Sequence, residues 1–171
     1  MVVQRKAVIY LGGPADAVKK IEPVVFGFAD LCMHLGDFGS ATKVKLVNNF
    51  LVALHIAGTA QAMAMGLKTG VDTNLLIKAV ATGSGGSTQF GIRAPWMAER
   101  RFLPQQGSGV GLVHYLETAK IMSDDAGINT ELLDCLIDIF ARAVPDIGSR
   151  DVAAMLEFFE SSNRHEKEPS R

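Results

Sequence analysis

The feature that most constrains this fold is a proline-free, weakly charged stretch from Ala41 to Lys68. It predicts one long helix ending at Gly70, and at about 1.5 Å per residue that helix would be roughly 42 Å long. Apolar residues fall on several of its faces, which predicts burial nearly all round; they are Leu46, Val47, Phe50, Leu51, Leu54, Ile56, Ala57, Ala60, Met63 and Ala64. We therefore expect a mainly α-helical bundle built around this helix.

The residues after Gly70 show helical patterns separated by breakers. Asp72 is placed to cap a helix that runs through Ala81. A glycine-rich turn and a flexible connection over residues 105–111 break the later pattern. The further predicted helices are Ser87–Arg101 (interrupted by Pro95), Leu112–Ala126, Thr130–Ala143 and Arg150–Ser161. No strand signal appears after Ser40.

The first 39 residues are different in character. They predict a strand over Lys6–Leu11, a turn at Gly12-Gly13-Pro14, a helix over Ala17–Val25 capped by Asp16, and a second strand over Ala29–Leu35. Strand, helix and strand in this order form the βαβ unit of a parallel sheet, and two strands do not make a stable sheet alone. We interpret 1–39 as the trailing piece of a larger α/β domain whose beginning is absent, 40–162 as an all-helical domain and 163–171 as a disordered tail.

Composition excludes several classes of protein. The formal net charge is −1, so no basic face indicates a nucleic-acid partner. The two cysteines are far apart and the four histidines are scattered, which indicates neither a disulfide framework nor a metal site. Polar residues such as Asn49 and Gln61 interrupt the long apolar stretch, which argues against a membrane span. With no secretory signal at Met1, a cytoplasmic location is expected.

The segment Gly36–Asn49, GDFGSATKVKLVNN, carries the best candidate site. Ser40 or Thr42 is placed to cap the long helix. Lys45 and Asn49 are four residues apart, so they lie one turn apart on one face. An ammonium beside a carboxamide suits an anionic or hydroxylated small molecule, and a desolvated lysine can act as a general acid or base. The alternative is a solvated lysine and an asparagine that pairs with backbone.

This segment resembles the β-hydroxyacid dehydrogenase family, whose interdomain helix begins with a pattern close to GxxGxGxxxKxxNN. Gly36, Gly39, Lys45, Asn48 and Asn49 match the pattern, while Ala41 replaces its second paired glycine. The resemblance implies that Lys45 is the catalytic lysine, which polarises the substrate carbonyl during hydride transfer. It also implies that Asn49 and Asn48 bind the substrate, a short β-hydroxy acid or its semialdehyde.

The resemblance extends over roughly residues 7–160. The serine-rich turn over 83–88 matches, which implies substrate binding by Ser87, and residues 93–104 match the family's R-x-P-x-M…F-x-P stretch. His114 and Tyr115 stand where the family carries a Lys-Asp pair. The resemblance implies that Gly39, Ser40 and His114 lie at the cofactor, NAD or NADP. His114 indicates a changed substrate, a changed cofactor preference or a lost activity, or it has no role.

The family's cofactor loop, GxGxMG after a first strand, is absent from this sequence. The glycine-rich residues 107–111 follow no strand, and Gly12-Gly13 lacks the third glycine at the required spacing. We therefore expect the chain to be inactive alone. The resemblance also implies a homodimer or higher homo-oligomer built through the long helix. The alternative is a non-catalytic helical oligomerisation or interaction module that has kept the fold.

Overall fold

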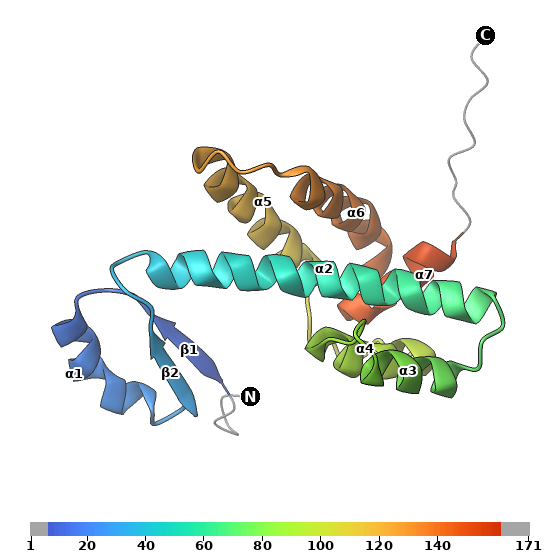
Figure 1. The fold of residues 1–171 in the computed structure, drawn as a ribbon, viewed down its shortest axis with the longest axis horizontal. Coiled ribbons are helices and arrows are strands. Elements are labelled where there is room, and N and C mark those ends of the chain that lie inside the picture. The colour runs from blue at the N-terminus through green and yellow to red at the C-terminus, as the bar shows by residue number, and fades with distance from the viewer. Residues whose placement is uncertain (1–6, 162–171) are drawn as a thin grey trace, which may run out of the picture.

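A computed structural model describes residues 7–161 of the chain. Figure 1 shows a small strand–helix–strand unit at one end of a long helix, with the remaining helices gathered along that helix. The elements are β1 (Val8–Leu11), α1 (Ala15–Val25), β2 (Leu31–His34), α2 (Ser40–Lys68), α3 (Thr73–Thr82), α4 (Thr88–Ala98), α5 (Gly109–Asp125), α6 (Glu131–Ile147), a 3₁₀ turn (Val152–Ala154) and α7 (Met155–Glu160). The prediction of a mainly helical bundle preceded by a βαβ unit is confirmed.

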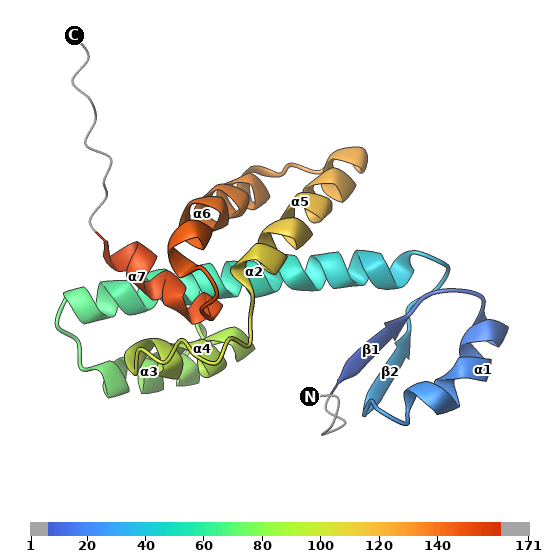
Figure 2. The ribbon, with the colours of Figure 1, turned by 180° about the vertical axis from the view of Figure 1, so that it is seen from behind.

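Helix α2 is the spine of the helical part, and α4, α5 and α7 pack along it. Its inward residues join one apolar core with Leu116 of α5 and Phe140 of α6. The expectation of burial nearly all round is wrong. Figure 1 shows α2 in front of its neighbours and Figure 2 shows them in front of α2, so one flank of α2 stays bare. That flank carries Val44, Val47, Leu51 and Met65, which are 38%, 52%, 43% and 65% exposed.

Length and composition alone would also let α2 cross a membrane, since its most apolar window has a mean hydropathy of 1.5. The core helix of a globular protein meets the same criterion. Here α2 carries the buried polar residues Asn49 and Thr59 on the face that packs against its neighbours. We therefore interpret it as a core helix.

Helix starts follow the predicted capping chemistry in part. Asp72 caps α3 as predicted, since its carboxylate accepts a hydrogen bond from the Leu75 N–H at 2.9 Å. Two other cap predictions are wrong: α1 is preceded by Pro14 rather than Asp16, and α2 by Gly39 with no side-chain cap. Gly39 has φ 92°, a left-handed conformation that favours glycine, so the backbone itself turns the chain into α2.

Prolines do not end the helices that contain them. Pro95 lies inside α4 and Pro145 inside α6, whereas the sequence predicted an interruption and an earlier end. Each proline costs a helix about 3 kcal/mol through a lost hydrogen bond and a steric clash. Ala94 and Met97 of α4 and Ile147 of α6 are nonetheless buried in the core. Burial of these flanking residues offsets the local cost, because tertiary packing dominates helix stability.

The two strands pair in parallel, with Ile9 opposite Cys32 and Tyr10 opposite Met33. Helix α1 contacts β2, and Ile9 and Cys32 are less exposed than Val8, Leu31 and Met33, so α1 covers the Ile9–Cys32 face of the sheet. Burial, with Glu22 of α1 adding to it, raises the pKa of the Cys32 thiol. Successive side chains alternate between faces, so Val8, Tyr10, Leu31 and Met33 share the other face. Val8, Leu31 and Met33 are 52%, 47% and 40% exposed, so that face is uncovered within residues 7–161.

Candidate functional site

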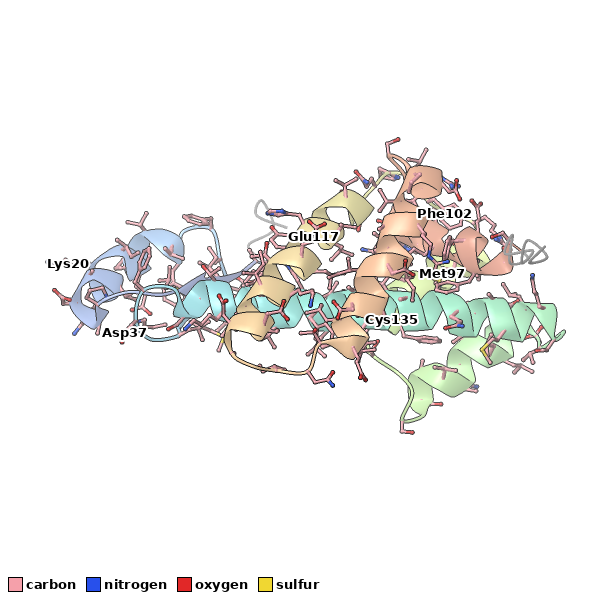
Figure 3. The ribbon with its side chains drawn as sticks, turned by 90° about the horizontal axis from the view of Figure 1, so that it is seen from above. Lys20, Asp37, Met97, Phe102, Glu117 and Cys135 are labelled. Atoms are coloured by element: carbon pink, nitrogen blue, oxygen red, sulfur yellow. The ribbon has the colours of Figure 1, made fainter. Side chains whose placement is uncertain are left out.

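The start of α2 is fixed against the end of the sheet by backbone contacts. The Gly13 N–H donates to the Gly36 carbonyl at 2.9 Å, and His34 Nε2 lies 2.8 Å from the Gly13 carbonyl oxygen. Gly12 sits so close to α2 that an added Cβ would be 3.0 Å from the Asp37 oxygen and 3.2 Å from the Ala41 nitrogen. Figure 3 labels Asp37 at this junction, beside the first turn of α2. The sheet end therefore sets where the first turns of α2 point.

Lys45 and Asn49 lie on the second and third turns of this anchored helix. Lys45 is exposed, whereas Asn49 is 6% exposed and its Nδ2 has no hydrogen-bond partner. An amide donor left unpaired inside a protein costs about 1–3 kcal/mol unless a ligand or water accepts from it. The two side chains thus lie at the boundary between the core and solvent.

Helix α5 brings aromatic side chains to the same place. Lys45 Nζ lies 6.0 Å from the centroid of the Tyr115 ring, and the His114 ring lies 5.9 Å from it. Both rings are exposed. The structure therefore places the predicted residues Lys45 and His114 around one shared neighbour, Tyr115, to which the sequence analysis assigned no role. In the sequence, Tyr115 was indicated only by its position beside His114, where the family carries a Lys-Asp pair.

The other predicted residues are less closely grouped. Asn48 is exposed on α2, beside Asn49 in the chain. Gly39 and Ser40 form the N-cap and first residue of α2. Ser87 caps α4, with its Oγ accepting from the Phe90 N–H at 3.0 Å. That hydrogen bond gives Ser87 a structural role, and its predicted role in substrate binding stays a prediction.

The start of α2 has a positive electrostatic character. The exposed amide hydrogens of a helix N-terminus carry about half a unit of positive charge. The first turn holds no acidic residue, and Lys43 and Lys45 follow. A helix N-terminus and two nearby cations both attract the carboxylate of a ligand. The ammonium group, the buried amide and the helix end together suit a small anionic molecule.

Two glycine-rich segments of residues 7–161 lie at or just before the starts of helices α1 and α5, and the contacts of both are structural. Gly12 lies close to Asp37 and Ala41, so its lack of a side chain serves packing against the start of α2. The other glycine-rich run is the start of α5, where Ser108 Oγ accepts from the Gly111 N–H at 3.2 Å. The predicted flexible connection therefore ends three residues earlier than expected. Within the described residues no three His, Cys, Asp or Glu side chains are placed to hold a metal ion.

A βαβ unit, a long connecting helix with a lysine and an asparagine near its start, and a helical bundle are the features by which this chain resembles the β-hydroxyacid dehydrogenases. Residues 39–159 match the family model described as the NAD-binding domain of NADP-dependent 3-hydroxyisobutyrate dehydrogenase. The chain belongs to this family, and the resemblance stated above is confirmed.

Individual relatives agree with this assignment. A 3-hydroxyisobutyrate dehydrogenase of Pseudomonas aeruginosa is 30% identical over 118 residues, which are 69% of this chain and 38% of that protein. An L-threonate dehydrogenase of Cupriavidus necator is 37% identical over 93 residues, 54% of this chain and 31% of that protein. The crystal structure of a 3-hydroxyisobutyrate dehydrogenase from Salmonella typhimurium superposes with a TM-score of 0.83 at 20% identity, covering 92% of this chain and 55% of that one.

The chain therefore spans less than two fifths of the two curated relatives and about half of the solved structure. Family membership and fold follow from these matches. The activity of a whole enzyme, its substrate and its partners do not.

Proposed function

We propose that this chain supplies the substrate-side half of an NAD(P)-dependent 3-hydroxyacid dehydrogenase acting on a short β-hydroxy acid or its semialdehyde. The observation that carries the proposal is the unpartnered buried Nδ2 of Asn49, one turn from the exposed ammonium of Lys45. Family membership supports the reaction class.

In this proposal, one residue of the chain orients the substrate and another transfers the proton. Asn49 Nδ2 donates a hydrogen bond to the substrate carboxylate or hydroxyl and fixes its orientation. Lys45 Nζ donates to the oxygen of the reacting carbon, and it holds the proton that this oxygen gains or loses. Asn48 extends the polar rim, and His114 stands where the nicotinamide end of the cofactor would approach. When bound, NAD or NADP supplies the hydride donor or acceptor.

We infer that the cofactor is bound by a part of the enzyme outside these 171 residues. Gly39 and Ser40 would border that cofactor, but they offer no pyrophosphate cradle of their own. On this reading the isolated chain binds neither nucleotide tightly and does not turn over substrate. If it instead proves inert toward hydroxy acids as well, the remaining function is that of a helical oligomerisation module.

A second copy of the chain is the partner that the bare flank of α2 favours. Val44, Val47 and Leu51 recur at intervals of three and four residues along that flank. This spacing is the pattern of helix-to-helix packing, and isologous pairing is the commonest arrangement of soluble oligomers. We therefore propose a homodimer formed through this flank of α2.

The test of the proposed site is ligand binding by the purified chain. Backbone amide spectra and calorimetry would follow titration with 3-hydroxyisobutyrate and L-threonate, with butyrate as the ligand that lacks a hydroxyl group. We expect shifts in the first turns of α2 and around residue 115, and loss of binding in Lys45→Met and Asn49→Leu. Lys78→Met, a lysine change on the exposed side of α3, is the matched control and should bind as wild type does.

Titration with NADH and NADPH separates the two parts of the proposal. We expect no heat with either nucleotide, because on this proposal the pyrophosphate is bound by another part of the enzyme. Hydroxy-acid binding that persists unchanged in both Lys45→Met and Asn49→Leu would refute the site. Tight nucleotide binding by the chain alone would refute the placement of the cofactor.

A further inference from the structure

An apolar pocket lies on the side of α2 next to the bare flank, between α2, α5 and the start of α6. Its volume is about 170 Å³, and its walls include Leu46, Phe50, Met122 and Leu133. An apolar cavity of about 150 Å³ is large enough to hold benzene. The pocket therefore has the size and the chemistry to receive one phenyl ring.

The border of the pocket is mostly apolar, and the lining also includes the polar residues Ser123, Asn129 and Thr130. Val47, Ile128 and Leu132 border it and are 52%, 60% and 52% exposed. Val47 also belongs to the bare flank of α2, so pocket and flank form one continuous apolar surface. A hollow within such a surface is the usual seat of an anchoring side chain from a partner.

The same chain presents a matching ring. Phe38 is 94% exposed, the most exposed large apolar side chain of residues 7–161. It lies in the turn between β2 and α2, next to Asp37, which Figure 3 labels. The turn is held in shape, because the Ser40 N–H donates to the Asp37 carbonyl at 3.0 Å and Gly36 and Gly39 both adopt positive φ. Phe38 is thus a ring held in solvent on an ordered turn.

We propose that Phe38 of one copy of this chain fills the apolar pocket of a second copy, and that the second copy's Phe38 fills the first copy's pocket. This contact rests on the homodimer proposed above, and it names Phe38 as the side chain that anchors one copy to the other. In a two-fold dimer each contact occurs twice, so one knob and one hole per chain are self-complementary. The Phe38 ring lies just before the first turn of α2, and the pocket lies about three turns further along the helix. If two copies of this segment cross in antiparallel orientation near Val44, the ring of each copy meets the pocket of the other.

The primary test is sedimentation equilibrium of the full chain over a range of concentrations. Replacing Phe38 by Ala should raise the dimer dissociation constant at least about tenfold, because two buried anchors are lost at once. Leu75→Ala is the matched control: Leu75 is 65% exposed on α3, which packs near the other end of α2, and its change should leave the constant unaltered.

Blocking the pocket tests the other half of the contact. Ala119→Leu or Ser123→Leu adds a side chain to the pocket wall and should weaken dimerisation as Phe38→Ala does, with an unchanged helical circular dichroism spectrum. A mixture of Phe38→Ala and Ala119→Leu chains is the decisive sample. The Phe38→Ala chain keeps an open pocket and the Ala119→Leu chain keeps the Phe38 ring. The mixture should therefore form a heterodimer that is tighter than the homodimer of either variant.

The outcomes are distinguishable. A wild-type dimer that Phe38→Ala leaves intact would overturn the ring-in-pocket contact while the homodimer stands. The same contact is refuted if the mixture of variants associates no better than each variant alone. A wild-type chain that stays monomeric up to about 1 mM would overturn the contact and the homodimer together.

Discussion

At the scale of single residues, the Asp151 carboxylate accepts four hydrogen bonds. It is completely buried, and its Oδ1 accepts from Arg93 at 2.7 Å and from the Ala153 N–H at 2.9 Å. Its Oδ2 accepts from the backbone N–H groups of Gln106 and Gly107 at 2.9 and 2.8 Å. One carboxylate thus ties α4, the loop before α5 and the turn before α7 together.

Replacing Asp151 by Asn should therefore destabilise the fold strongly. An amide NH₂ would face donors on one side, and the Arg93 guanidinium would lose its buried counter-charge. Breaking a buried ion pair in this way costs about 3–5 kcal/mol. Urea unfolding followed by circular dichroism measures the loss.

The control for this change is Asp138→Asn. Asp138 pairs with Arg142 one turn away at 2.9 Å, but both side chains are exposed. Exposed helical pairs contribute about 0.3–0.5 kcal/mol, so this variant should unfold nearly as wild type does. Equal effects of the two substitutions would contradict the role assigned to Asp151.

At the scale of elements, Lys120 links α5 to α6. Its Nζ lies 3.1 Å from Asp134 Oδ1 and 3.1 Å from Asp124 Oδ1. The hydrogen bond from Lys120, with a second from Thr130, lowers the pKa of Asp134 below its ordinary value. The hydrogen bonds to Asp134 and Asp124 in turn raise the pKa of Lys120.

The lowered pKa of Asp134 sets the pH range in which the Lys120–Asp134 ion pair stabilises the fold. The unfolded carboxyl titrates near its ordinary pKa of about 3.9, so the stabilisation is fully present above that pH. It is lost as the pH falls through the lowered pKa of the folded state. The difference in melting temperature between wild type and Asp134→Asn should be constant from neutral pH to about pH 5 and shrink below about pH 4. A difference in melting temperature that stays unchanged down to pH 2 would contradict a stabilising Lys120–Asp134 ion pair.

The elements also show what the sequence could predict. Composition and spacing were enough for α2 and for the order of the strands and α-helices, because long apolar periodicity and glycine breaks are local signals. They predicted a continuous helix over 150–161, where the structure has a 3₁₀ turn followed by α7. Asp151 caps that turn, and its hydrogen bonds to Arg93 and to the loop before α5 are long-range contacts that no local pattern encodes.

For the candidate site too, the sequence predicted some features, and others depend on the packing of the helices. Lys45 and Asn49 could be placed on one side of a helix from their spacing, and their roles came from resemblance to a family. That Asn49 is buried with an unpaired Nδ2 while Lys45 stays exposed depends on how α5 packs against α2. The contact between Lys45 and Tyr115 depends on the same packing. These features follow only from the three-dimensional arrangement.

At the scale of the whole molecule, stability is distributed unevenly. The main apolar core runs from Leu46 to Leu156 and contains only residues of the helical part. The strand–helix–strand unit buries few apolar side chains, Val18, Val25 and Ala29, and one face of its two-stranded sheet is uncovered. Figure 1 shows this unit set apart from the helices and joined to them through the start of α2.

Native-state hydrogen exchange of the full chain should therefore resolve two levels of protection. Local opening costs least where few apolar contacts are broken, so the amides of Ile9 and Cys32 should exchange at least about tenfold faster than those of Leu116 and Phe140. Adding low concentrations of urea should speed the exchange of the strands before that of the helical core, since the strands open without the core. Exchange of the strand amides as slow as that of Phe140, with the same dependence on urea, would mean instead that β1 and β2 unfold only with the helices. In that case the contacts at Gly12 and Gly13 would couple the sheet to α2 more strongly than their small buried surface implies.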